Sequence, residues 1–258
     1  MSLFSVPGAR ISFDVVGDDG PAVVALHGLT SSRRREELMQ LDVANHVPGV
    51  RLLRYDARGH GRSTGRARPE DYRWPRLAED LLALVDDVFP GESVHGVGPS
   101  MGTATLLHAA LSRPDRFRTL TLMVPPTAWA SRRARAAGYE EAASLVETEG
   151  VAAFVGADDA PRPPAVAHTP VGVPDVPTGL LPAVMRGAAS SDLPRPQVVA
   201  TIRVPTLVLA WTHDEGHPLS TAETLTSLLP DTTLRIAETP DDLATWPSLV
   251  ARHVLAQG

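Results

Sequence analysis

The chain has 258 residues, no cysteine and a formal net charge of −6 at pH 7. This length suits one large domain with a substantial core, and the lack of cysteine excludes disulfides, thiolate nucleophiles and cysteine-ligated metals. The negative charge argues against nucleic acid or an anionic membrane as a partner. All 24 basic residues are arginine, which excludes a Schiff-base lysine and a serine–lysine dyad.

The N-terminal residues 1–7 have neither a basic start nor an apolar run. We therefore expect no secretion signal, and the chain offers no apolar window of about 18 residues that would span a membrane. A cytoplasmic location is the expectation.

Strands and helices alternate in the first half of the chain. A half-exposed strand is predicted first, followed by four buried strands, at residues 10–16, 21–26, 51–55, 94–97 and 119–124. Helices are predicted from Ser31 or Ser32 through Leu41 and from Trp74 to Pro90. This alternation predicts an α/β fold with a mostly parallel sheet and helices on both faces.

The most informative motif is Gly98-Pro99-Ser100-Met101-Gly102. A short β-branched run precedes it, and apolar residues follow it at helical spacing. When a G-x-S-x-G motif lies between a strand and a helix, its serine sits on a sharp turn with its hydroxyl exposed. Both glycines are needed because a side chain at either position would collide with the neighbouring strand or helix.

Two further motifs stand at the ends of predicted strands, His27-Gly28-Leu29-Thr30 after residues 21–26 and Asp56-Ala57-Arg58-Gly59-His60-Gly61-Arg62-Ser63 after residues 51–55. With these motifs the chain resembles the α/β-hydrolase superfamily, particularly small esterases, enol-lactonases and cofactor-free haloperoxidases. The resemblance is close over residues 10–125 and looser over residues 200–258. It implies an eight-stranded sheet with a helical cap inserted.

The pattern changes after residue 125. Residues 139–149 read as a helix, but the prolines over residues 161–196 exclude a long helix there. We therefore expect a hydrolase core at residues 1–125 and 198–258, with residues 126–197 as a cap or lid. Six apolar or aromatic cap residues are candidates for lining an acyl pocket, although packing within the cap explains each equally well: Trp129, Tyr139, Phe154, Leu180, Leu181 and Met185.

The remaining elements are a strand over residues 204–211, a helix over 220–229, a strand over 233–237 and a final helix from 247 or 248 to 256. The resemblance implies Ser100 as the nucleophile and the backbone N–H groups of Leu29 and Met101 as oxyanion donors. It also implies Asp214 as the carboxylate that orients the base, with Glu215 as the neighbour that could be confused with it. We expect no cofactor, and His213 and His217 lack the third ligand of a zinc site.

The catalytic base that the resemblance implies is missing from its expected position. Family members carry a histidine after the last strand, but residues 238–246 contain none. Three explanations are open: His217 serves as the base, Asp241 or Asp242 acts at the vacated position, or hydrolysis has been lost. Of the nine histidines, only His213 and His217 flank Asp214 where such folds bind ligands.

The leading hypothesis is a serine hydrolase that acts on a small carboxylic ester or lactone through an acyl-enzyme at Ser100, with a small-molecule ester or acyl compound as its partner. The alternative is a non-hydrolytic member of the fold, which binds a ligand or catalyses another reaction. A haloperoxidase-like perhydrolase would differ from the leading hypothesis only in the acyl acceptor. An imidazole within hydrogen-bond reach of the Ser100 hydroxyl would discriminate between the first two.

Overall fold

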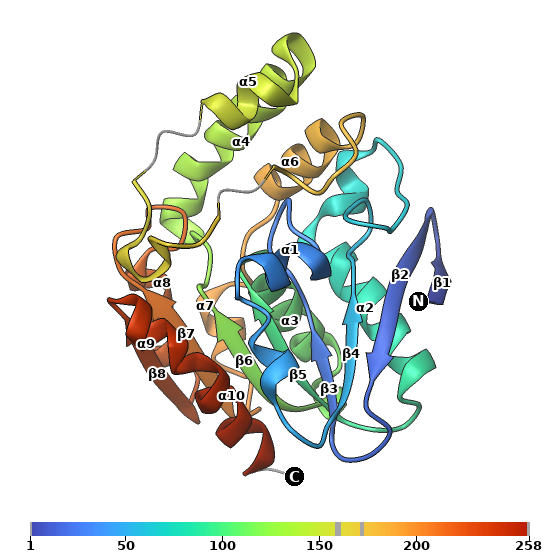
Figure 1. Cartoon of the computed structure of the whole chain (residues 1–258), viewed down its shortest axis with the longest axis vertical. Helices are drawn as coiled ribbons and strands as arrows, with labels where there is room; N and C mark the ends of the chain where they lie inside the picture. The colour runs from blue at the N-terminus through green and yellow to red at the C-terminus, as the bar shows by residue number, and fades with distance from the viewer. Residues whose placement is uncertain (1, 158–160, 171–172, 257–258) are drawn as a thin grey trace.

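The computed structural model describes residues 2–157, 161–170 and 173–256. Its centre is an eight-stranded sheet in the order β1-β2-β4-β3-β5-β6-β7-β8 (Figure 1). The strands β1 and β2 form antiparallel pairs, and all pairs from β4 to β8 are parallel. The predicted α/β class and mostly parallel sheet are confirmed. In the described part of the chain, no helix has the length and apolar character needed to cross a membrane.

The strands are short, as expected for a parallel sheet covered on both faces. They are β1 Ser2–Val6, β2 Ala9–Val16, β3 Ala22–Ala25, β4 Arg51–Tyr55, β5 Val94–Pro99, β6 Phe117–Met123, β7 Thr206–Trp211 and β8 Thr232–Ala237. Every residue of β5 and of β7 is buried. The carboxyl ends of these two strands are therefore fixed in position, and the loops that follow them can hold side chains in defined places.

Helices connect the strands and cover the sheet. The α-helices are α1 Arg33–Leu38, α2 Trp74–Val88, α3 Met101–Ser112, α4 Trp129–Glu149, α5 Val151–Gly156, α6 Leu181–Ala189, α7 Pro196–Val199, α8 Leu219–Leu228, α9 Pro240–Ala244 and α10 Trp246–Leu255. Four 3-10 segments are η1 Val43–His46, η2 Pro69–Tyr72, η3 Pro114–Arg116 and η4 Pro164–Val166.

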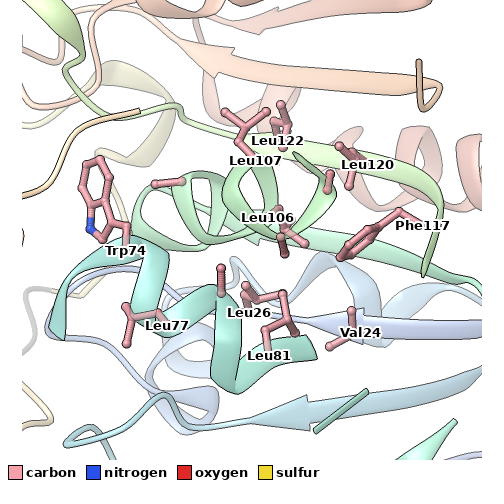
Figure 2. Close-up of a cluster of buried hydrophobic side chains, with 14 of the residues drawn as sticks. Val24, Leu26, Trp74, Leu77, Leu81, Leu106, Leu107, Phe117, Leu120 and Leu122 are labelled. Atoms are coloured by element: carbon pink, nitrogen blue, oxygen red, sulfur yellow. The ribbon is translucent and has the colours of Figure 1, made fainter. Parts of the chain in front are cut away.

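Two apolar cores lie on opposite faces of the sheet, because neighbouring strand residues point to opposite sides. In β3, Val24 joins the core under α2, α3 and α8, whereas Val23 joins the core under η1 and α10. Leu53 and Leu52 of β4 divide in the same way. Figure 2 shows the first core, in which Leu107 of α3 lies beside Leu122 of β6, while Leu77 and Leu81 of α2 belong to the same core. Both cores hold β5 in place.

Some predicted boundaries are wrong. The helix expected to continue to Leu41 ends at Leu38, because Met39 closes it and Gln40 takes φ 57°. The cap helix expected at residues 139–149 begins ten residues earlier, at Trp129. Neither β1 nor α9 is anticipated, since a five-residue strand and a one-turn helix leave weak patterns.

A third apolar cluster ties α4 and α6 together in the segment between β6 and β7. Leu181 and Met185 are buried in it, and Tyr139, Phe154 and Leu180 pack against it. Trp129 instead packs against the core under α2 and α3. Each of the six candidate pocket residues thus packs against an apolar core. In Figure 1, α4 and α5 project beyond the carboxyl edge of the sheet.

Two buried histidines make stability depend on pH. Burial, the largest cause, lowers the pKa of His60 to about 3 and that of His95 to about 4. The unfolded chain takes up protons on these groups as pH falls through about 6.5, whereas the folded chain does not until far lower pH. Stability is therefore lost as pH falls below that value.

We predict that the free energy of unfolding, measured by urea titration, is lower at pH 5.5 than at pH 7.5. The difference should shrink in His95→Gln, because a neutral amide can replace the contact of the imidazole with Thr119 without titrating. Both imidazoles should remain neutral at pH 5.5 by NMR of the folded protein. A resonance of either that titrates near pH 6.5 would contradict the prediction.

Candidate functional site

Ser100 occupies a strained turn between β5 and α3. Its backbone has φ 52° and ψ −110°, a conformation that side-chain-bearing residues rarely adopt. The turn is secured on both sides: the Ser100 N–H donates to the carbonyl of Met123 at 2.9 Å, and its carbonyl accepts from Ala104 at 3.1 Å. The side chain is half-buried, so its hydroxyl can be reached.

The two glycines of the motif allow this turn to pack. A Cβ on Gly98 would lie 3.0 Å from both the Gly102 backbone and the Leu26 Cβ, and a Cβ on Gly102 would lie 2.9 Å from the Leu26 Cβ. Real Cβ atoms rarely approach so closely. The steric reason that the sequence indicates for these glycines therefore holds.

Three side chains that the sequence singles out come together above β5. Nε2 of His217 lies 2.8 Å from Oγ of Ser100, and Nδ1 of His217 lies 2.8 Å from Oδ2 of Asp214. The serine follows β5, while the other two residues belong to the loop after β7. Both loops leave the carboxyl end of the sheet, which is why residues 117 positions apart can meet.

The state of Asp214 determines the tautomer of His217. Burial raises the pKa of Asp214, but hydrogen bonds from His217, Trp211 and the Gly216 N–H outweigh it and hold the pKa well below its usual range. An ionised carboxylate only accepts hydrogen bonds, so Nδ1 of the imidazole must carry the proton. Nε2 is then a lone-pair acceptor that faces the Ser100 hydroxyl, and such an arrangement can take up a hydroxyl proton.

The loop after β3 approaches Ser100 closely. A Cβ on Gly28 would lie 3.7 Å from the Ser100 Cβ, which puts Leu29 next to the serine. Among the described residues, neither the Leu29 N–H nor the Met101 N–H donates a hydrogen bond within the chain. Unpaired backbone N–H groups of this kind can stabilise a negatively charged oxygen.

His27 holds that loop. The Ala57 N–H donates to its Nε2 at 2.9 Å, so Nδ1 carries the proton and donates to the Gly28 carbonyl at 2.8 Å. Burial, the largest cause, lowers the pKa of His27 and keeps it neutral. Because a peptide unit is planar, fixing the Gly28 carbonyl also fixes the direction of the Leu29 N–H.

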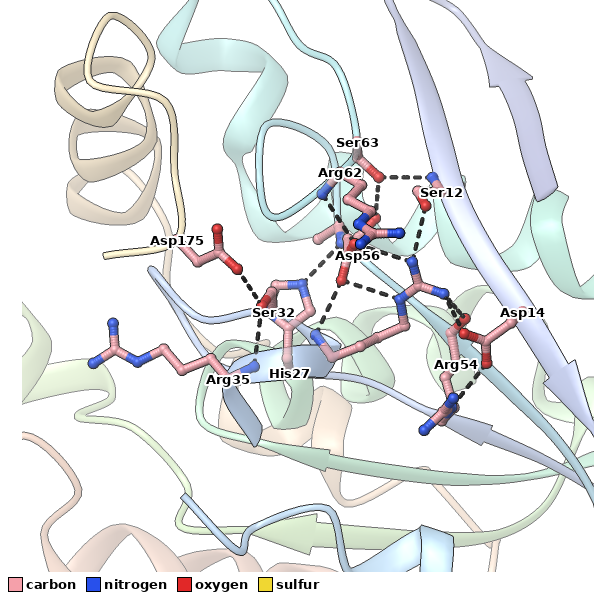
Figure 3. Close-up of polar contacts among 12 residues, drawn as sticks. Ser12, Asp14, His27, Ser32, Arg35, Arg54, Asp56, Arg62, Ser63 and Asp175 are labelled. Atoms are coloured by element: carbon pink, nitrogen blue, oxygen red, sulfur yellow. Dashed lines mark hydrogen bonds and ion pairs between the residues drawn. The ribbon is translucent and has the colours of Figure 1, made fainter. Parts of the chain in front are cut away.

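A second anchor comes from the segment between β6 and β7. The Ser32 hydroxyl donates to Asp175 at 2.5 Å, and the backbone N–H of Asp175 donates to the Thr30 carbonyl at 2.8 Å. Figure 3 shows Asp175 beside Ser32 and His27, at the edge of the ion-paired group around Asp56. The segment thus contacts the same loop that carries Leu29.

Of the two aspartates that follow the last strand, Asp242 caps a helix. Asp242 lies in the first turn of α9, where its Oδ2 accepts from the N–H groups of Glu238 and Thr239 and from the Thr239 hydroxyl, at 2.8–3.0 Å. These bonds, the hydroxyl first, lower its pKa. The Asp242 N–H returns a bond to the Thr239 hydroxyl at 3.2 Å. This reciprocal pair is a helix-capping arrangement, and Asp241 is exposed.

The other candidates lie apart from the serine. Glu215 and His213 are exposed, and the carboxylate that contacts His217 is that of Asp214. His108 and His253 bond backbone carbonyls of Asp192 and Leu120, and the exposed His46 and His168 line a groove beside α9. No three His, Asp or Glu side chains in the described ranges are grouped to hold a metal.

Two contacts of the loop after β7 have no counterpart in the sequence predictions. Trp211 donates its indole N–H to Oδ2 of Asp214 at 2.7 Å, and the Thr127 N–H donates to the Gly216 carbonyl at 3.0 Å. A tryptophan at the end of a buried strand reads as core. The signal that could have identified it is its spacing, three residues before the acid.

We predict that Asp242→Ala leaves turnover of a small activated ester unchanged within about twofold while lowering the urea midpoint, because its carboxylate caps α9. The urea midpoint of Asp242→Asn, which keeps one acceptor oxygen, should lie between those of Asp242→Ala and the wild type. Steady-state kinetics and urea titration test this. Loss of turnover in a folded Asp242→Asn protein would make this carboxylate the working group.

Residues 21–143 match the family model described as the alpha/beta hydrolase fold. A lipase of Mycobacterium tuberculosis, LipV, is 34% identical over 120 residues, which cover 46% of this chain and 43% of the lipase. The 3-oxoadipate enol-lactonase 1 of Acinetobacter baylyi is 26% identical over 217 residues, 80% of this chain and 77% of that protein. The chain therefore spans less than half of the lipase.

Solved structures agree over nearly the whole chain. An enol-lactonase from Burkholderia xenovorans superposes with a TM-score of 0.77 at 21% identity, covering 98% of this chain and 100% of that one. A hydrolase from Pseudomonas aeruginosa gives a TM-score of 0.78 at 24% identity, with 99% and 97% covered. With the strand order and the turn at Ser100, these matches show that the chain has the alpha/beta hydrolase fold.

Proposed function

We propose that this protein is a serine hydrolase that acts on small carboxylic esters or lactones through an acyl-enzyme at Ser100. The observation that carries the proposal is the unbroken hydrogen-bonded series from Ser100 Oγ through His217 to Asp214. A hydroxyl is a weak nucleophile at neutral pH unless a base removes its proton. His217 stands where that base is needed.

In the proposed reaction Ser100 Oγ attacks the carbonyl carbon while its proton passes to Nε2 of His217. Asp214 stabilises the imidazolium that forms, and the N–H groups of Leu29 and Met101 stabilise the oxyanion. When the tetrahedral intermediate collapses, His217 gives the proton to the leaving alkoxide. Water, deprotonated by the same nitrogen, then attacks the ester carbon of the acyl-enzyme and releases the acid and Ser100.

Similar proteins support the substrate class. Two of them are named enol-lactonases, one is named a lipase, and another solved neighbour is named a thermophilic esterase. All four names describe cleavage of a carboxylic ester or lactone. The imidazole within reach of Ser100 favours this activity over the non-hydrolytic alternative.

We propose residues 126–197 as the cap over this site. Two features support this: the Thr127 N–H bonds the loop that carries His217, and Asp175 bonds the loop that carries Leu29. An open cavity of about 530 Å³ lies between α4, α5 and α6, lined in part by Tyr139, Phe154 and Met185. The segment therefore contacts both loops that the reaction uses.

We predict that Ser100→Ala abolishes turnover of p-nitrophenyl acetate and that His217→Ala lowers it by about 10³-fold or more, with little change in stability. His168→Ala and His253→Ala are the matched controls, and both should keep nearly full turnover because these side chains lie away from Ser100. Steady-state kinetics with urea titration of each variant provides the test. Unchanged turnover in folded His217→Ala would remove the proposed base.

A further inference from the structure

The acid and the base belong to one loop, so their mutual contact does not by itself fix them relative to Ser100. Within the described part of the chain, Oδ1 of Asp214 accepts only from that loop, from the N–H groups of Gly216 at 2.8 Å and His217 at 3.1 Å. Oδ2 accepts from Nδ1 of His217 at 2.8 Å and from the Trp211 indole at 2.7 Å. The indole is thus the side-chain contact that ties the acid to the strand framework.

The indole is itself immobilised. Trp211 is the last residue of β7 and is 6% exposed, and its ring stacks on that of Trp246 with centroids 6.0 Å apart and planes inclined by 12°. Trp246 is 1% exposed and begins α10. The edge-to-face contact of Trp211 with His217, at 6.2 Å and 88°, extends this packing to the base.

Trp246 is the last residue of the segment 238–246, in which the resemblance implies a histidine. That segment here forms the capped helix α9, and the chain then enters α10 with Trp246 against Trp211. The region after the last strand therefore contributes a stacking surface for Trp211. Because Asp214 and His217 share a loop, they need such external support, since a small displacement of Asp214 would carry His217 away from Ser100.

We propose that Trp211 is a positioning residue for the reaction: its indole N–H holds Oδ2 of Asp214, and through it His217, in register with Ser100, with Trp246 as its platform. This inference rests on the proposed serine hydrolase function. The indole N–H occupies one lone pair of Oδ2, so Nδ1 of His217 can bond this oxygen only from the direction of the other lone pair. It also helps to keep the carboxylate ionised, because a donor stabilises the charged form.

Trp211→Phe tests this, since it keeps an aromatic ring for stacking and removes the donor. We expect kcat for p-nitrophenyl acetate to fall about tenfold with KM changed by less than about twofold, because a charge-assisted hydrogen bond is lost from the catalytic group and not from the substrate site. The low-field NMR signal of the His217 Nδ1 proton should shift or broaden. Trp246→Phe, which keeps the donor, should have a smaller effect.

Trp74→Phe is the matched control. The Trp74 indole N–H is buried and has no hydrogen-bond partner among the described residues, so its removal alters a core tryptophan without touching Asp214. Its kcat should equal that of the wild type. An equal loss of kcat in Trp74→Phe, or a folded Trp211→Phe protein with wild-type kcat and an unchanged His217 signal, would overturn the inference.

A measurement on the wild type covers the case in which Trp211→Phe does not fold. Phosphonylation of Ser100 by a fluorophosphonate should shift the Trp211 indole N–H resonance, because the hydrogen bonding of His217 to Asp214 changes, and should leave that of Trp74 in place. An unshifted Trp211 resonance would contradict the inference. A wild type inert to both ester and probe would instead contradict the proposed function, so the two failures are distinguishable.

Discussion

The hydrogen bond between His217 and Ser100 joins two loops that come from different strands, and the geometry of the site depends on it. One loop is the sharp turn after β5, which buried neighbours on both sides hold in a strained conformation. The other carries Asp214 and His217 together after β7. Because acid and base share a loop, their mutual bond forms locally, and the long-range requirement is that the two strand ends stay in register. The parallel pairing of β5, β6 and β7 supplies that register.

Backbone strain gathers at the same edge of the sheet. Six described non-glycine residues have positive φ, and five of them follow strand ends there: Thr30, Ser100, Val124, Trp129 and His213. Each such conformation costs on the order of 1–3 kcal/mol and persists only where the surroundings impose it. The surroundings here are the two cores that enclose β5 and β7. These cores therefore maintain the strained residues at the carboxyl edge of the sheet, where the site lies.

Much of this could be predicted from the sequence because its signals are local. The turn at Ser100 is encoded by two glycines, a preceding β-branched run and a following helical repeat, all within twenty residues. The position of His217 could be inferred only as one of three alternatives, because a distance between residues 117 positions apart depends on strand order. The contact of Trp211 with Asp214 could not be predicted, because a tryptophan at the end of a buried strand gives the same sequence pattern whether it only packs in the core or also bonds the acid. Asp242 was ambiguous since a carboxylate can serve either as a helix cap or as a base.

The central claim is that His217, from the acid loop, activates Ser100. The most direct measurement is the rate and position of phosphonylation by a fluorophosphonate probe, followed by intact mass and peptide mapping. The account predicts a single adduct on Ser100, none in Ser100→Ala, and labelling slowed by about 10³-fold in His217→Ala. A wild type that is not labelled beside a reactive control hydrolase, or a His217→Ala protein labelled at the wild-type rate, would contradict it.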